Sequence, residues 1–296
     1  MKILIFGARG MLGHQLCRTL SQRMDVWATL RGDPDELQQY KLLPAERLVG
    51  NVNALDSRAV QEVIESVKPS AVVNAIGIVK QRNEIKQAIQ TIQVNALFPH
   101  QLAEICKQRS VRLIHVSTDC VFSGLRGQYS EVDLPDPVDL YGRSKLIGEI
   151  DHSGCLTLRT SIIGWELFER TSLLEWFAKQ RGRRIKGYKK AIFTGFTSKV
   201  LANLIGDIID TRPDLNGIYQ VSSEPISKHD LLTRLRDELE WDDITIDPDT
   251  LFLCDRSLIS TRFKTATGWQ PPEWSEMIQG LTEEWPTYAD WRGAEK

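Results

Sequence analysis

Short apolar runs and amphipathic stretches alternate along the first half of the chain. The apolar runs lie at residues 2–6, 25–30, 71–76, 111–117 and 156–163. A continuous apolar run of this length is typical of a parallel strand that is buried on both faces. The stretches with helical spacing between them lie at residues 57–67, 84–107 and 140–150. This alternation predicts an α/β fold in which helices cover both faces of a doubly wound parallel sheet.

A glycine-rich turn with the spacing GxxGxxG follows the first apolar run, and a leucine stripe on one helical face follows the turn. We expect Gly7 to allow the tight turn, Gly10 to let the backbone approach a diphosphate, and Gly13 to let the helix pack closely. The free N–H groups of the helix would then face the anion. The alternative is an ordinary glycine turn of an α/β protein. The dinucleotide site that the turn predicts, of the Rossmann type, consists of Gly7, Arg9, Gly10, Met11, Leu12 and Gly13.

The second apolar run leads into Arg31, at the place where an NAD site usually carries a carboxylate for the ribose 2′-hydroxyl. We expect no carboxylate at this strand end. Arg31 and Arg9 are instead two cations within reach of a 2′-phosphate. The prediction is therefore NADP(H) rather than NAD(H), and the alternative is that both arginines are solvated.

The pattern changes after Gly164, where the predicted strands shorten and aromatic and basic residues become more frequent. Residues 227–241 have helical spacing with Ser227 as an N-cap, and residues 268–274 indicate an ordered loop before a final helix. We expect residues 217–222 to return to the sheet. The predicted division is an NADP-binding Rossmann domain at residues 1–163, with a returning segment near 195–225, and a smaller C-terminal substrate-binding lobe at 164–194 and 226–296.

Composition and charge exclude several classes of function. The chain has 296 residues and a formal net charge of −2, so nothing draws it as a whole to nucleic acid or to a membrane. No apolar stretch is long enough to span a bilayer, and the chain begins directly with an apolar strand, which argues against a signal peptide. Five scattered cysteines without a CxxC pair indicate reduced thiols in the cytoplasm and no metal site.

Tyr141 and Lys145 are four residues apart, which places them on one face of a predicted helix. An ammonium group near a phenol favours the phenolate, so we expect Lys145 to lower the pKa of Tyr141. A tyrosine with such a pKa can pass a proton to or from a carbinol oxygen near neutral pH. Thr118 follows a predicted strand, where it can hydrogen-bond the same oxygen. These three residues are the predicted catalytic group, and the alternative is a chance pair on a helix surface.

These motifs resemble those of the extended short-chain dehydrogenase/reductases, and within them the sugar-nucleotide reductases related to dTDP-4-dehydrorhamnose reductase. The matching segments are residues 7–13, 73–77, 94–95, 117–124, 141–149 and 158–161, with weaker matches at 194–198 and 268–272. The resemblance implies that NADP(H) reduces the 4-keto group of a 6-deoxy sugar linked to a nucleoside diphosphate, with Tyr141 as the general acid. It also implies that the product feeds surface polysaccharide synthesis.

The resemblance assigns further roles along the chain. Lys145 would hold the nicotinamide ribose, and Asn51 and Val52 would lie near the adenine. Asn95 would brace the site, and the alternative for Asn95 is a core asparagine satisfied by backbone. The other predicted cofactor contacts are Ala75, Ile76, Gly77, Asn95, Ser117, Tyr141 and Ile162. Predicted substrate contacts in the first domain are Lys80, Asp119 and Val121.

Basic residues are concentrated early in the second half, at Lys179, Arg181, Arg183, Arg184, Lys186, Lys189 and Lys190. Guanidinium groups match the oxygens of a diphosphate, so Arg183 is a predicted substrate contact. The alternative is a solvated basic face. Trp176 and Phe193 are predicted to stack on a base or sugar, although aromatic residues are more often part of a core. The sequence leaves open whether the chain forms a homodimer.

Departures from the family pattern leave other functions open. The rhamnose-pathway reductases usually have tyrosine at the position of Cys120, and residues 76–81 replace their alanine-rich segment. Related dehydratases usually have glutamate at the Cys120 position. The absence of this glutamate weakens the dehydratase alternative. An epimerase that recycles its cofactor is a second alternative, with Cys120 as an acid/base, although a buried packing role for this thiol is simpler. The third is an NADP-binding regulatory subunit like the beta subunit of methionine adenosyltransferase, which shares these motifs.

Overall fold

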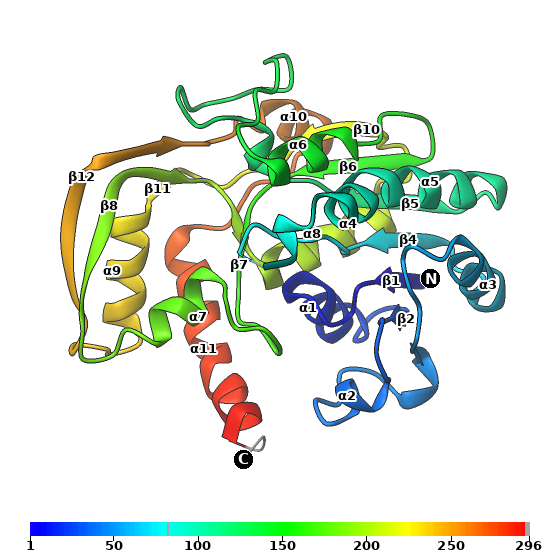
Figure 1. The fold of residues 1–296 in the computed structure, drawn as a ribbon, viewed down its shortest axis with the longest axis horizontal. Helices are drawn as coiled ribbons and strands as arrows, with labels where there is room; N and C mark the ends of the chain where they lie inside the picture. Colours follow the sequence, from blue (N-terminus) through cyan, green and yellow to red (C-terminus); the bar gives the residue numbers. More distant parts are fainter. Residues whose placement is uncertain (82, 294–296) are drawn as a thin grey trace.

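A parallel sheet of seven strands forms the centre of the molecule (Figure 1). The computed structural model describes residues 1–81 and 83–293. The strands in spatial order are β10 (Gly217–Gln220), β6 (Cys155–Arg159), β5 (Arg112–Val116), β4 (Ala71–Asn74), β1 (Lys2–Phe6), β2 (Asp25–Thr29) and β3 (Leu48–Val49). Every neighbouring pair in this sheet is parallel. The order reverses beside β1 in the manner of a doubly wound Rossmann sheet, so the predicted fold class is confirmed.

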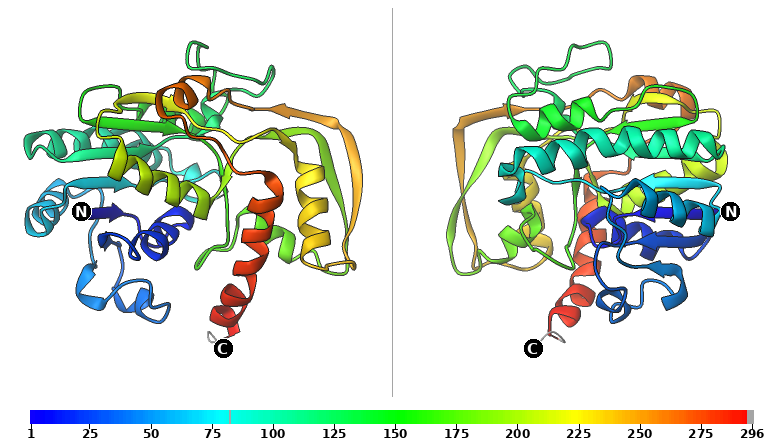
Figure 2. Two further views of the ribbon diagram at one scale, coloured as in Figure 1. Left: turned by 180° about the vertical axis from the view of Figure 1, so that it is seen from behind. Right: turned by 45° about the vertical axis from the view of Figure 1, so that its right-hand side comes forward.

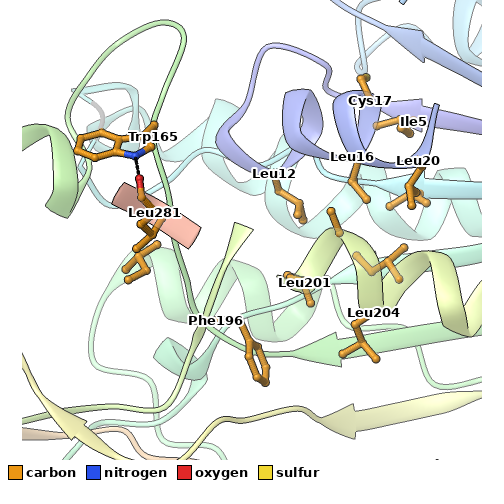
Figure 3. Close-up of a cluster of buried hydrophobic side chains, with 14 of the residues drawn as sticks. Ile5, Leu12, Leu16, Cys17, Leu20, Trp165, Phe196, Leu201, Leu204 and Leu281 are labelled. Atoms are coloured by element: carbon orange, nitrogen blue, oxygen red, sulfur yellow. Dashed lines mark hydrogen bonds between the residues drawn. The ribbon is translucent and has the colours of Figure 1, made fainter. Parts of the chain in front are cut away.

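The two faces of the sheet have separate cores because successive side chains of a strand point to opposite faces. On β1, Ile3 and Ile5 lie in the core cluster that contains residues of α1 and α8. Leu4 and Phe6 lie in the cluster that contains residues of α3 and α5. Figure 3 shows the first of these clusters, where leucines of α1 and α8 face one another.

Helices flank this sheet on both faces (Figures 1 and 2). The helices of this part of the molecule are α1 (Met11–Leu20), α2 (Asp35–Gln38), α3 (Ser57–Val67), α4 (Ala88–Ile92), α5 (Phe98–Gln108), α6 (Leu140–Ile147), α8 (Ser198–Thr211) and α10 (Thr261–Thr267), of which α2 lies in the connection after β2. The shorter helical segments are η1 (Ala45–Arg47), η2 (Asn83–Lys86), the π-helical η3 (Gln93–Leu97) and η4 (Asp119–Val121). The helix predicted at residues 84–107 is therefore interrupted, because a 3-10 segment and a π-turn precede α5.

A smaller lobe extends beyond the sheet. Its elements are α7 (Leu173–Ala178), β8 (Arg184–Phe193), β11 (Ile226–Ser227), α9 (Lys228–Glu238) and β12 (Thr245–Asp255). A further pair, β7 (Ile162–Ile163) and β9 (Phe196–Thr197), is parallel. The expectation of only short strands after Gly164 is wrong, since β8 and β12 pair along most of their ten and eleven residues. Ser227 caps α9 as predicted, because its side chain accepts a hydrogen bond from the Asp230 N–H.

The last helix, α11 (Trp274–Gly293), runs between the central sheet and the smaller lobe (Figures 1 and 2). The indole N–H of Trp165 donates to the Leu281 carbonyl over 2.8 Å (Figure 3). One core cluster runs from Ile3 on β1 to Tyr288 on α11. The edge strand β10 comes from the second half of the chain. The boundary at residue 163 stays a prediction, because the apolar core is continuous across it.

Candidate active site

The ends of three parallel strands bring the predicted motifs together. β1, β4 and β5 are neighbours and run in one direction, so their carboxyl ends lie at one edge of the sheet. The glycine turn follows β1, residues 75–77 follow β4, and Thr118 follows β5. A Cβ placed on Gly7 would lie 3.0 Å from the Ile76 side chain. Ligands of open α/β sheets bind at this kind of edge.

The glycine turn is shaped so that larger residues are excluded at two positions. Gly7 has a φ of 101°, a conformation that L residues rarely adopt. A Cβ on Gly13 would lie 1.9 Å from the Gly7 carbonyl oxygen. Helix α1 then begins at Met11 with Gly10 as its N-cap, and no side chain caps the N-terminus. The first N–H groups of α1 therefore remain directed toward this edge of the sheet, where an anion can accept their hydrogen bonds.

The cations predicted for a 2′-phosphate differ in their surroundings. Arg31 is exposed. Arg9 lies 2.5 Å from the carboxylate of Glu36 and 4.3 Å over the Phe168 ring. The expectation of no carboxylate at this strand end is wrong, because α2 returns Glu36 to the backbone of Gly32. The sequence did not reveal Glu36, since it lies five residues beyond Arg31, on the four-residue helix α2, which the apolar pattern did not predict.

The remaining predicted cofactor contacts lie on segments around the same edge. Asn51 is exposed with a φ of 57°, and Val52 is buried. Residues 75–77 and Ile162 are half-buried, whereas Leu12 is part of the core. Met11 lies against Gly164, since a Cβ there would approach the Met11 side chain at 3.3 Å. The role of each in binding stays a prediction.

Asn95 lies in the π-turn η3 and joins two segments of the site. Its side chain accepts from the Ile78 N–H at 2.8 Å and donates to the Ile78 carbonyl at 2.9 Å. It also donates to the Ser144 hydroxyl on α6 at 3.2 Å. Asn95 therefore braces the helix of Tyr141 and Lys145 against the segment after β4, and backbone satisfies two of its three hydrogen bonds. Isolated π-turns often occur at functional sites.

Tyr141 lies on the first turn of α6, within hydrogen-bonding reach of Thr118. Asp139 caps this helix by accepting from the Gly142 N–H at 2.8 Å. Burial raises the pKa of the Tyr141 phenol, the nearby Cys120 and carboxylates of Asp119 and Asp139 raise it further, and the Thr118 contact lowers it. The expected lowering of this pKa by Lys145 is therefore wrong in this structure.

The Lys145 side chain contacts β5. Its ammonium nitrogen donates to the Val116 carbonyl at 2.7 Å and lies 3.4 Å from Nε2 of His115. The residue is only 4% exposed. Burial lowers the pKa of Lys145 to about 8, and Glu149 acts against this shift. The lysine therefore titrates near physiological pH, even though it does not set the pKa of Tyr141.

A buried ion pair connects the segment just after α6 to the end of β6. Nε and Nη2 of Arg159 donate to the two carboxylate oxygens of Glu149 over 2.8 and 2.7 Å, and both side chains are almost fully buried. The Ser117 hydroxyl donates to the same carboxylate at 2.7 Å. Ser117 thus contacts protein here, while its predicted cofactor contact stays a prediction. Glu149 and Arg159 both lie within the sequence segments that match the family. Their spacing from Lys145 was therefore the signal by which the sequence could have indicated this ion pair.

Of the three substrate contacts predicted in the first domain, two lie beside Tyr141 or Thr118 and the third is buried. Lys80 forms a 2.6 Å ion pair with Asp139, which places it beside the N-terminus of the Tyr141 helix. Asp119 accepts from the Thr118 hydroxyl at 3.2 Å. Val121 is 0% exposed in a cluster with Phe122 and Tyr129. The prediction of a substrate contact at Val121 is corrected, since its side chain offers no surface to a ligand.

The basic residues of the second half are largely neutralised. Arg181, Arg184 and Lys186 pair with aspartates on or next to β12, and Lys189 pairs with Asp230. Arg183 is exposed, Trp176 is 40% exposed on α7, and Phe193 packs against Trp274. Their contacts with substrate stay predictions, and the ion pairs favour the charge-compensated surface over a diphosphate site.

Arg256 is a cation beside the loop after Thr118 that sequence reasoning missed. Its guanidinium donates to the Phe122 and Ser123 carbonyls at 2.9 and 3.2 Å. Burial acts to lower the pKa of Arg256. The pKa is nevertheless raised by the neighbouring thiols of Cys120 and Cys254 and by the carboxylates of Asp119 and Asp139. Arg256 thereby ties the end of β12 to the loop after Thr118, and it lay in a stretch without a recognisable motif.

The fold and this edge define a dinucleotide-binding α/β protein. The chain belongs to the family described as RmlD substrate binding domain, which matches residues 1–172. It is 26% identical over 305 residues to dTDP-4-dehydrorhamnose reductase of Aggregatibacter actinomycetemcomitans, covering 95% of this chain and 98% of that protein. It is 30% identical over 171 residues to methionine adenosyltransferase 2 subunit beta of Danio rerio, covering 56% of this chain and 49% of that protein.

A solved structure supports the fold over almost the whole chain. The dTDP-4-dehydrorhamnose reductase of Bacillus anthracis str. Ames in complex with NADP superposes with a TM-score of 0.79. The two chains are 20% identical, and the match covers 96% of this chain and 99% of that one. Within the described ranges 1–81 and 83–293, no helix is both long and apolar enough to cross a bilayer.

Proposed function

We propose that this protein is an NADP-dependent reductase that acts on the 4-keto group of a 6-deoxy sugar linked to a nucleoside diphosphate. The observation that carries the proposal is the placement of Thr118 and Tyr141 within hydrogen-bonding reach, beside the glycine turn and with Lys145 one helical turn further on. The full-length match to a dTDP-4-dehydrorhamnose reductase supports the class of substrate.

The glycine turn fits a dinucleotide cofactor. The missing side chains at Gly7 and Gly13 leave the backbone close-packed, and the uncapped N-terminus of α1 can receive a diphosphate. Arg9 and Arg31 favour a 2′-phosphate, hence NADP(H). The bound cofactor supplies the hydride that reduces the carbonyl carbon.

The protein's own groups act on the carbonyl oxygen. Tyr141 carries its proton at neutral pH, as any phenol with an ordinary or raised pKa does, and can donate it to the oxygen as the alkoxide develops. Thr118, whose hydroxyl now faces Asp119, can donate a second hydrogen bond and orient the carbonyl. Lys145 lies on the same helix as Tyr141, and its positive charge favours the ionised tyrosine that is left after proton transfer.

Two other functions remain to be distinguished. An epimerase would use Cys120 as an acid/base, but burial raises the pKa of this thiol to about 12, so the thiolate is scarce near neutral pH. A cofactor-binding regulatory subunit is favoured by the 30% identity to methionine adenosyltransferase 2 subunit beta. That match covers about half of each chain, whereas the reductase match covers nearly all of both.

The test is NADPH oxidation with a panel of nucleotide-linked 4-keto-6-deoxy sugars, followed by the loss of reduced nicotinamide absorbance. Tyr141→Phe should lose at least about a hundredfold in kcat, since a positioned general acid contributes roughly 10²–10⁴. Tyr188→Phe is the matched control, because it removes a phenol hydroxyl from β8, in the smaller lobe. All three proteins should still bind NADPH.

The outcomes separate the candidates. Turnover that is lost in Tyr141→Phe and kept in Tyr188→Phe supports the reductase and identifies its sugar. Product inverted at a carbon without net NADPH consumption would favour the epimerase. Tight NADPH binding with no turnover on any ketone, together with co-purification of a larger enzyme, would favour the regulatory subunit.

A further inference from the structure

A buried line of polar groups runs from the segment after β4 to Lys145. The Ile76 N–H donates to Oδ1 of Asn74 at 3.1 Å. Nδ2 of Asn74 lies 3.1 Å from Nδ1 of His115, and Nε2 of His115 lies 3.4 Å from the Lys145 nitrogen. Asn74, His115 and Lys145 are 1%, 0% and 4% exposed, so bulk water does not compete for these contacts.

The direction of each hydrogen bond follows from the one before it. Because Oδ1 of Asn74 accepts from backbone, its amide nitrogen faces His115 and donates to Nδ1. A neutral imidazole whose Nδ1 accepts carries its proton on Nε2. That N–H is the group that faces Lys145. An ammonium group has only N–H donors, so the charged lysine meets another donor at this contact, whereas the neutral amine can accept from it.

We propose that His115 is a positioning residue for Lys145: Asn74 fixes the ring proton on Nε2, and this N–H makes the lysine nitrogen release its proton more readily than an acceptor in the same place would. Neither His115 nor Asn74 is proposed to contact the substrate or the cofactor. The arrangement of protons follows from the contacts alone, and its use in the reduction rests on the proposed function.

Within residues 1–81 and 83–293, the charges that act on this pair come from α5, α6 and the residues just after α6. Glu149, two residues beyond the end of α6, is the carboxylate that favours the charged lysine, and Arg159 and Ser117 already occupy its oxygens. On the side of His115, burial and the positive charges of Lys145 and His100 keep the imidazole neutral by lowering its pKa. Burial itself lowers the pKa of Lys145 to about 8, so the contact with Nε2 acts on an amine that already titrates near physiological pH.

Nitrogen-15 NMR of the histidine rings in the full-length protein tests the proton arrangement without any substrate. The signals of His115 are assigned by their loss in His115→Gln, or by through-bond connection to the backbone. The expected result is a neutral ring between about pH 6 and pH 9 with the proton on Nε2. A proton on Nδ1, or an imidazolium in this range, would overturn the proposal, and this measurement needs only the wild-type protein to fold.

Asn74→Asp tests the coupling to the lysine. A carboxylate accepts from both neighbours, so it draws the ring proton to Nδ1 and leaves Nε2 as an acceptor for the ammonium. The pKa of the Lys145 amine, followed through its nitrogen-15 signal, should rise by about one unit. His100→Gln is the matched control, since His100 lies on α5 and bonds the Ile147 carbonyl, and it should leave the ring proton on Nε2. An unchanged lysine titration in Asn74→Asp would overturn the coupling.

The pH profile of kcat then asks whether reduction uses this ionisation. In Asn74→Asp, an apparent pKa in the kcat profile should shift by as many pH units as the pKa of the Lys145 amine. The KM for NADPH should change less. A moved lysine signal with an unmoved kcat profile would overturn the role in reduction. A protein that reduces no ketone would instead refute the proposed function, while the NMR spectra still decide the proton arrangement.

Discussion

The carboxylate of Glu36 lies 2.5 Å from the guanidinium of Arg9, beside the Gly32 backbone just beyond β2. A carboxylate at this place holds the ribose 2′-hydroxyl in NAD sites, and a cation holds the 2′-phosphate in NADP sites. This chain presents both groups together. Glu36 occupies Arg9 with opposite charge, and it would also repel a phosphate dianion, so the preference for NADPH is limited from within the site.

Glu36→Gln should therefore raise the affinity for NADPH by about two- to fivefold, because an exposed ion pair is worth at most about 1 kcal/mol. The affinity for NADH should stay level or fall, since the acceptor for the 2′-hydroxyl is weakened. Fluorescence titration of both reduced cofactors measures the ratio of their dissociation constants.

The matched control for that change is Glu62→Gln, which removes a carboxylate paired with Arg58 on the surface of α3. It should leave both dissociation constants unchanged. If Glu36→Gln altered the two cofactors equally, the effect would be one of net charge, and Glu36 would have no part in discrimination.

Gly13→Ala should abolish cofactor binding. The new methyl group would lie 1.9 Å from the Gly7 carbonyl oxygen, and that neighbour is backbone, so α1 must move away from β1. We expect a destabilisation of about 3 kcal/mol or more, seen as a lower urea midpoint, together with loss of NADPH binding.

Gly280→Ala provides the contrast for Gly13→Ala. Gly280 lies inside α11, and a Cβ there meets nothing within 4 Å. The change should stabilise the protein by up to about 1 kcal/mol, because alanine is the better helix former. Equal effects at the two positions would contradict the close packing of the glycine turn.

The sequence was sufficient wherever one local signal determined one local structure. The helix predicted at residues 57–67 matches α3 at both ends, because Asp56 caps its first turn and Lys68 ends it with a left-handed φ of 51°. The lengths of β8 and β12 could not be predicted this way. These strands stabilise each other through pairing across about 60 residues of chain, and their exposed charges interrupt the apolar pattern.

The site shows the same limit. The glycine turn, Thr118, Tyr141 and Lys145 could be predicted because each belongs to a motif with fixed spacing. The roles of His115 and Glu36 depend on what the fold places beside them, 30 residues away at Lys145 and 27 residues away at Arg9. Periodicity contains no information about such pairs. The direction of the Tyr141 pKa shift was wrong for this reason, since Lys145 bonds Val116 instead.

Glu149→Gln should destabilise the protein by about 3–5 kcal/mol, because it leaves the charge of Arg159 buried and without its counterion. It should also lower the pKa of Lys145 further, since Glu149 is the group that raises it. The double variant Glu149→Leu/Arg159→Met should be less destabilised than the single change, as urea unfolding of the variants would show. A double variant as unstable as the sum of its single changes would contradict the ion-pair interpretation.

Acid should destabilise the protein through His14, which links the glycine turn to α11. Nδ1 of His14 donates to the Gly10 carbonyl at 2.9 Å, and Nε2 lies 2.6 Å from the Tyr288 hydroxyl. Burial lowers the pKa of His14 to about 4, with Arg18 acting in the same direction. Between pH 6.5 and 4 the unfolded chain therefore binds the proton that the folded protein refuses, so this stability is present above pH 6.5 and is lost as the pH falls toward 4.

From about pH 7.5 to pH 5 this group should cost roughly 2 kcal/mol of unfolding free energy. The pH dependence of stability is compared between wild type and variant. Wild type alone is not sufficient, because the raised pKa of the nearby Glu284 makes its contribution to stability increase as the pH falls, opposite to that of His14. His14→Gln should show a shallower fall in stability than wild type, by about that amount, in urea unfolding at the two pH values. His152→Gln, which changes an exposed histidine, should keep the wild-type slope. Parallel curves for wild type and His14→Gln would show that His14 is not the group whose protonation opens the contact between α1 and α11.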